Sequence, residues 1–146
     1  MSGHATGSVW PSARPPAATP VLSWELDDIA QLPQVRAEVR RFATAREPSA
    51  PAAADLRDQL ILAFDEMASN ALRHGGGRVE AAVRLTGDAY LIEVSDQAAG
   101  APPSPAVGRD PSEGGLGLYL IAELATAHGW YVSDGLKHVW ALLPRR

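Results

Sequence analysis

Hydrophobic residues recur along the chain at two different spacings, which separate the strands from the helices. Alternating or strand-forming segments occur at residues 21–26, 78–85, 89–94, 130–133 and 138–143. Gly87-Asp88 and Asp134-Gly135 lie between the members of the last two pairs, as in hairpin turns. The pattern therefore predicts one N-terminal strand followed later by two β-hairpins.

Three other segments carry apolar residues three or four positions apart, which is the spacing of one helix face. They are residues 33–46, 55–74 and 115–128. Pro33 suits the first turn of the first helix, and Asp55 is a good N-cap residue for the second. The second helix should end at the glycine run 75–77.

Two segments have no hydrophobic period. Residues 1–20 are rich in Pro, Ala, Ser and Gly, which predicts a disordered N-terminal tail, and we do not expect Trp10 to dock on the domain. Residues 96–114 contain four prolines and should form a long loop. Loops of that length within a domain are usually functional or disordered, so this one is a candidate lid.

The order of these elements is strand, helix, helix, hairpin, loop, helix, hairpin. Helices are too few and too clustered for regular alternation of strands and helices around a parallel sheet. We therefore expect an α+β fold, a two-layer α/β sandwich with helices on one face of a mixed, mainly antiparallel sheet. A single domain over residues 21–146 would contain all of it.

Composition narrows the class of protein. With 46% hydrophobic residues, 21% charged residues and a net charge of −4, the chain is typical of a globular domain and offers no basic surface for direct nucleic-acid binding. The absence of cysteine excludes a thiolate metal site and a cysteine nucleophile. The N-terminus lacks a secretory pattern and no stretch is apolar enough to span a membrane, so we expect a cytoplasmic protein without membrane contact.

The stretch EMASNALRHGGG contains the first candidate chemistry. Glu66, Asn70 and His74 follow one another at four-residue steps, so Glu66 and Asn70 are neighbours on one helix face. An amide oxygen suits Mg²⁺ that also binds substrate phosphates, and a carboxylate can accept a proton from an attacking hydroxyl. The alternative is that these are solvated polar residues, with His74 favoured simply by the negative end of the helix dipole.

Two further stretches carry glycines beside polar groups. In VSDQAAG, Asp96 follows a strand and could accept a hydrogen bond from the amine of adenine, with Gly100 allowing close approach of a planar ring. An ordinary Asp turn is an equal alternative. In GGLGLYL, glycines open a helix, where free N–H groups bind phosphate; a flexible hinge is the alternative.

The order and spacing of these three stretches resemble the Bergerat ATP-binding fold of the GHKL superfamily, which includes gyrase, a heat-shock chaperone, histidine kinases and MutL. The resemblance covers about residues 21–143. The short length and the terminal GLKHVWALL hairpin resemble bacterial anti-sigma factor serine/threonine kinases and their small regulatory relatives. A histidine kinase is less expected, because the chain has no room for a phosphoacceptor-helix domain.

The resemblance implies ATP and Mg²⁺ as cofactors and assigns roles residue by residue. Asn70 matches the metal-binding Asn, Glu66 the general base and Asp96 the adenine-binding residue. The expected nucleotide contacts are Asn70, Arg73, His74, Asp96, Gly100, Gly114, Gly115, Leu116, Gly117 and Leu118. Gly115 and Gly117 match the phosphate-binding glycines among them.

One departure bears on activity. Ala98 stands where the second motif usually has its first glycine, and the lid is short and rich in proline. Three functions therefore remain open: a kinase that phosphorylates a small anti-sigma factor antagonist, an ATP-dependent module that binds a sigma factor or antagonist without chemistry, and a domain without nucleotide. Relatives often act as homodimers, and apolar residues on the first strand and helix are compatible with that.

Overall fold

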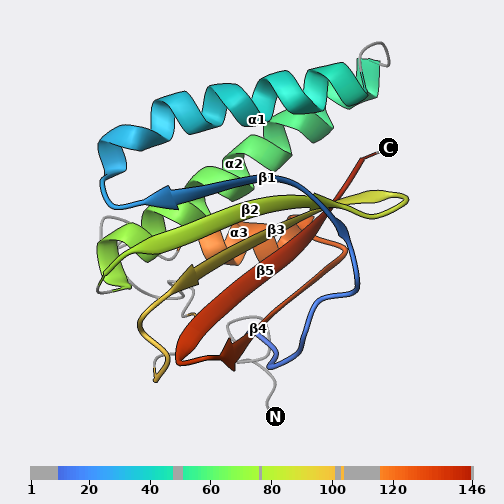
Figure 1. The fold of residues 1–146 in the computed structure, drawn as a ribbon. Helices are drawn as coiled ribbons and strands as arrows, with labels where there is room; N and C mark the ends of the chain where they lie inside the picture. The colour runs from blue at the N-terminus through green and yellow to red at the C-terminus, as the bar shows by residue number, and fades with distance from the viewer. Residues whose placement is uncertain (1–9, 48–50, 76, 101–102, 104–115, 146) are drawn as a thin grey trace.

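The computed structural model describes residues 10–47, 51–75, 77–100, 103 and 116–145. Within them, five strands form one antiparallel sheet in the order β1-β2-β3-β5-β4, and the helices cover one face of this sheet (Figure 1). The expected α+β two-layer sandwich is confirmed, and every neighbouring pair of strands in this part of the chain is antiparallel.

The five predicted strands are all present. Their bounds are β1 Thr19–Leu26, β2 Val79–Leu85, β3 Ala89–Asp96, β4 Ala127–Ser133 and β5 Leu136–Pro144. The two tight turns fall where the sequence indicated. Asp134 and Gly135, which join β4 to β5, both have positive φ angles, 55° and 77°, which Asp and especially Gly tolerate.

The helices are α1 Leu32–Arg46, α2 Pro51–His74 and α3 Leu116–Leu124, with a single 3₁₀ turn at Ile29–Gln31 before α1. The prediction that Asp55 caps the second helix is wrong, because α2 already begins at Pro51 and Asp55 lies exposed within it. Proline favours a first helical turn, and the alanines after it have high helix propensity.

The third helix ends four residues before the expected His128. Residues from Ala127 onwards pair with β5 instead, with Ala127 opposite Leu142 and Gly129 opposite Trp140. Sheet pairing offers these residues a ladder of backbone hydrogen bonds, which outweighs the helical spacing of their side chains.

The hydrophobic core lies between the helices and the sheet. α2 contributes Leu60, Phe64 and Met67, each at most 2% exposed, and the Trp24 ring of β1 meets Phe64 edge to face with centroids 5.3 Å apart. Alternate residues of the central strands complete this core, among them Val79, Ala81, Val83, Ile92, Val94, Val139 and Ala141. The C-terminal half of α2 is thereby held against β3 and β5.

The expectation of a disordered tail over residues 1–20 is wrong for its second half, whereas residues 1–9 lie outside the described residues. Trp10 is 2% exposed. The backbone N–H of Trp130 in β4 donates to Pro11 O at 3.0 Å, and the backbone carbonyl of Trp130 accepts from Ala13 N at 2.9 Å. The edge of β4 offers unpaired backbone groups, and residues 10–14 satisfy some of them. We call residues 10–14 the edge segment.

Beyond the edge segment the chain passes to the opposite edge of the sheet, where β1 begins (Figure 1). The Trp140 indole donates to Ala13 O at 2.8 Å, and the Trp10 ring packs edge to face on His128 at 4.7 Å. Burial lowers the pKa of His128 below its usual value. These contacts anchor the N-terminal segment through two aromatic rings.

Of the long loop expected over residues 96–114, the structure describes only residues 96–100 and Pro103. The proposed lid therefore lies outside the described residues.

Candidate functional site

The C-terminal half of α2 positions Glu66 and Asn70. Both side chains are partly exposed, and they lie on the helix beside the buried stripe that includes Phe64 and Met67. A four-residue step leaves two side chains about 40° apart on the helix. Glu66 and Asn70 therefore lie together at the rim of the core, as the spacing predicted.

The first turn of α3 lies directly against Glu66. A Cβ atom on Gly117 would overlap the Glu66 carboxylate, whose Oε2, Cδ and Cγ atoms are the nearest neighbours of that position. Glycine at this position therefore leaves the space that the Glu66 side chain occupies against α3. The candidate general base and a candidate phosphate-binding glycine, 51 residues apart in the sequence, are thus in contact.

The remaining residues of the glycine-rich stretch are placed differently. Gly114 and Gly115 lie outside the described residues, and Leu116 begins α3 with a side chain that is not described. The Leu118 side chain is 2% exposed and belongs to the hydrophobic core. Any contact between Leu118 and a nucleotide must therefore come from its backbone.

The end of α2 meets the end of β3. Gly75 donates its N–H to Ala71 O at 2.7 Å, and a Cβ atom on Gly75 would lie 2.6 Å from the Cβ atom of Asp96. Asp96 itself is 3% exposed. The first glycine after the helix is thus a packing requirement that brings the α2 motif and Asp96 together.

Both carboxylate oxygens of Asp96 have neighbours. Oδ1 accepts the backbone N–H of Ala98 at 2.8 Å, which is the Asp turn weighed as an alternative from the sequence. Oδ2 lies 3.7 Å from Nζ of Lys137. The turn does not exclude ligand binding, because each carboxylate oxygen accepts more than one hydrogen bond.

Lys137 was not predicted as a site residue. It is the chain's single lysine, lies on β5 directly opposite Asp96 of β3, and its side chain is 10% exposed. No local motif marks it, because its proximity to Asp96 depends on the register between two strands that are distant in the sequence.

The basic residues that follow Asn70 are exposed. Arg73 donates from Nη2 to Ser69 Oγ at 3.3 Å, and this hydroxyl donates to the Glu66 carbonyl at 3.3 Å. His74 is exposed at the end of α2, and Gly100 is exposed, with open space around its Cα. The Arg73 side chain therefore lies along α2 on the same side as Ser69.

A surface pocket of about 360 Å³ opens between the start of α1 and α2, beside Glu66. It is lined by Ile29, Ala30, Leu32, Pro33, Arg36, Asp65, Glu66, Ser69 and Arg73. Arg36 of α1 and Asp65 of α2 form an ion pair across it at 2.6 Å. This pocket could not be predicted from the sequence, because its two walls come from different helices.

A family model described as a histidine kinase-like ATPase domain matches residues 27–142. The chain belongs to this family. It is also 37% identical over 84 residues to the alginate biosynthesis sensor protein KinB of Pseudomonas aeruginosa. That alignment covers 50% of this chain but only 14% of KinB, so the similarity concerns one part of a much longer protein.

Membership in the histidine kinase-like ATPase family implies that the domain binds ATP. The three motifs that carry the resemblance come together in the structure through two close contacts, Gly117 with Glu66 and Gly75 with Asp96. The role of each side chain toward the nucleotide stays a prediction.

Among the described residues, no group of three or more His, Asp or Glu side chains could hold a metal ion by itself. A partly exposed amide such as Asn70 fits a different arrangement, in which Mg²⁺ takes one protein oxygen and shares the phosphates of a bound nucleotide. In the same part of the chain, no helix is both long and apolar enough to cross a membrane.

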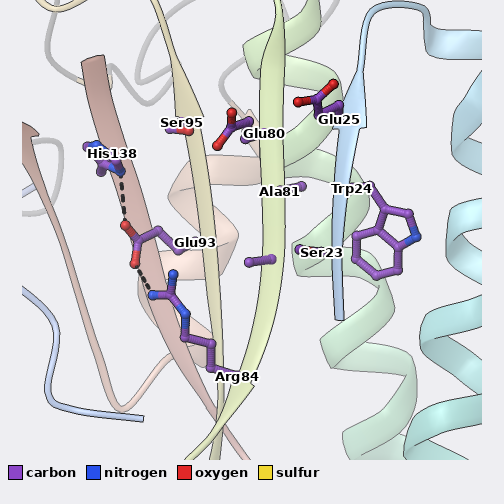
Figure 2. A pocket seen from close by; sticks show the side chains of 10 residues that line it. Ser23, Trp24, Glu25, Glu80, Ala81, Arg84, Glu93, Ser95 and His138 are labelled. Atoms are coloured by element: carbon purple, nitrogen blue, oxygen red, sulfur yellow. Dashed lines mark hydrogen bonds and ion pairs between the residues drawn. The ribbon is translucent and has the colours of Figure 1, made fainter. Parts of the chain in front are cut away.

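The opposite face of the sheet of this ATPase domain carries a second pocket of about 380 Å³ (Figure 2). At its floor Glu93, 6% exposed, accepts from Arg84 Nη1 at 2.8 Å and lies 3.0 Å from His138 Nδ1. The Tyr131 hydroxyl also donates to Glu93; burial and this bond raise the Tyr131 pKa to about 12. The buried carboxylate is thus compensated within the sheet, as a structural group requires.

Proposed function

We propose that this ATPase domain is a protein serine/threonine kinase of the anti-sigma factor type, which phosphorylates a small antagonist protein. One observation supports this most directly. The Glu66 side chain touches Gly117 at the start of α3 on one side and lines the surface pocket between α1 and α2 on the other. A hydroxyl entering from that pocket would reach Glu66 next to the predicted phosphate site.

In this proposal the oxygen of a serine or threonine hydroxyl attacks the γ-phosphorus of ATP. The bond between that phosphorus and the β,γ-bridging oxygen breaks, which releases ADP, and Glu66 accepts the hydroxyl proton. Asn70, one turn away on α2, would hold the Mg²⁺ that neutralises the phosphate charge. When bound, this ion supplies electrostatic stabilisation of the transferring group.

The character of the pocket favours a protein segment as the second substrate. Ile29 at its rim is 45% exposed, and the exposed Ala30 and Pro33 add further apolar surface. Arg36, Asp65 and Arg73 supply polar groups around it. An apolar rim with charged neighbours is typical of surfaces that bind other proteins.

The experiment is transfer of label from γ-labelled ATP to a panel of purified anti-sigma factor antagonist proteins, with the wild-type chain and with Glu66→Gln. Transfer to a serine or threonine should slow by about 100-fold or more in Glu66→Gln, because a general base contributes at least that factor. ATP affinity, measured by calorimetry, should not change.

Glu80→Gln is the matched control, since Glu80 is an exposed carboxylate on the opposite face of the sheet and should transfer label like the wild type. Persistence of full transfer in Glu66→Gln would exclude Glu66 as the base.

Ala98 favours a second function, a module that captures a sigma factor or an antagonist only when ATP is bound. Ala98 replaces a glycine of the family motif, and a Cβ atom there restricts the backbone next to Asp96. Tight, ATP-dependent partner binding without any phosphorylated product would support this function. Stoichiometric phosphorylation of the partner would exclude it as a full description.

A further inference from the structure

Lys137 and Asp96 form a buried pair of opposite charges at the end of β3 and β5. Their side chains are 10% and 4% exposed, and Nζ lies 3.7 Å from Oδ2. The two residues are directly opposite each other in the β3–β5 register. Burying two charges is costly unless they are paired and their remaining hydrogen-bonding groups are satisfied.

The two charged groups lie side by side without a direct hydrogen bond between Nζ and Oδ2. A separation of 3.7 Å exceeds the usual 2.7–3.2 Å of an N–H···O hydrogen bond. The Ala98 N–H fixes the orientation of the carboxylate through Oδ1. Asp96 thus presents an acceptor, and Lys137 presents an ammonium donor immediately beside it.

An acceptor next to a donor is complementary to the Watson–Crick edge of adenine, where the N6 amine is a donor and the adjacent N1 is an acceptor. Enzymes that recognise a base by this edge use such paired hydrogen bonds. A carboxylate alone accepts from any amine. A carboxylate with a hydrogen-bond donor beside it selects a base that has an acceptor in the ring position next to its amine.

We propose that Lys137 is a specificity-determining residue of the ATP site, which donates a hydrogen bond to N1 of adenine while Asp96 accepts one from the N6 amine. This inference rests on ATP binding at Asp96. Guanine would present an N–H donor at N1 to the ammonium, so the pair selects against it.

The experiment is calorimetric titration of the wild-type chain and of Lys137→Met with three nucleotides. They are ATP, 1-deaza-ATP, in which a C–H replaces N1, and 7-deaza-ATP, in which a C–H replaces N7. Methionine keeps the length of an unbranched side chain but removes the donor. The 7-deaza analogue is the control for a general effect of removing a ring nitrogen.

We expect the wild-type chain to bind 1-deaza-ATP about tenfold more weakly than ATP, equivalent to about 1.4 kcal/mol, and 7-deaza-ATP as well as ATP. In Lys137→Met the difference between ATP and 1-deaza-ATP should vanish. Lys137→Arg should restore it, because a guanidinium also donates.

Equal affinities of the wild-type chain for ATP and 1-deaza-ATP would overturn the proposal, and this comparison needs no variant to fold. If Lys137→Met lost the same affinity for all three nucleotides, the ion pair of Lys137 with Asp96 would have only a structural role, which would overturn the proposal. In an additional titration of the wild-type chain with GTP, tighter binding of GTP than of ATP would also overturn it. Absence of ATP binding by the wild-type chain is a distinct result, which would remove the ATP site itself.

Discussion

Gly117 shows how a missing side chain can bring two candidate site residues into contact. Its Cα lies so close to the Glu66 carboxylate that any Cβ atom would overlap it, although the residue is helical and its φ angle needs no glycine. Replacing glycine by alanine inside a helix normally stabilises it by roughly 1 kcal/mol. A loss of function in Gly117→Ala would therefore not come from a weakened helix.

We predict that Gly117→Ala folds but binds ATP at least about tenfold more weakly, because Glu66 and the start of α3 must move apart. Calorimetry with ATP measures the affinity, and circular dichroism checks the fold. Gly87→Ala is the matched control, since a Cβ atom there meets nothing within 4 Å. Wild-type affinity in Gly117→Ala would show that this close approach is not needed for ATP binding.

The candidate site residues differ in how visible they are in the sequence. Glu66, Asn70 and Asp96 could be chosen as candidates because each lies in a short motif whose spacing has a chemical meaning. Lys137 could not, because only the pairing of β3 with β5 brings it to Asp96. Leu118 was expected at the nucleotide, yet its side chain fills the core, since a helical position next to Gly117 faces a different direction.

At the scale of elements, the edge segment shows where composition misleads. Residues 1–20 have the proline and alanine content of a disordered tail, but Trp10 is fully buried and the backbone of residues 11–13 bonds to β4. Residues 10–14 make only a few backbone hydrogen bonds to β4, so they do not need the alternation of polar and apolar residues that marks a full strand. One large aromatic side chain supplies the apolar burial that holds the segment.

We predict that Trp10→Ala lowers the free energy of unfolding by about 3–5 kcal/mol, the usual cost of truncating a buried tryptophan. Urea unfolding followed by circular dichroism measures this. Pro11→Ala is the control, because Pro11 is exposed and its carbonyl would still accept from Trp130. Equal stability of the two variants would mean that the edge segment contributes little to the fold.

Across the whole molecule, local pattern was enough for the elements but not for their assembly. Alternation and turn residues were enough to predict the strands and their turns. The start of α2 and the end of α3 differ from the prediction, because α2 already begins at Pro51 and the residues after α3 pair with β5. The meeting of the three motifs depends on two long-range contacts, Gly75 with Asp96 and Gly117 with Glu66. A single sequence indicates which residues have suitable chemistry, and packing decides which of them meet.

The two edges of the sheet differ, and this difference leads to a prediction about assembly. The edge segment pairs with β4, whereas β1 is the terminal strand at the other edge of the described sheet. Within the described residues no strand pairs with the outer edge of β1, and a terminal strand of eight residues is a template for pairing with another strand. Val21 and Leu22 on this strand are only partly buried and would gain burial in an interface.

We therefore expect the chain to form a homodimer in which the β1 strands of two copies pair. Light scattering after size exclusion should give about twice the 15.4 kDa mass of one chain, and Val21→Lys should shift the protein to monomer, because lysines on both edge strands would repel and resist burial. Thr44→Lys, an exposed change on α1, controls for added charge alone. A wild-type monomer at high protein concentration, or a dimer unaffected by Val21→Lys, would exclude pairing through β1.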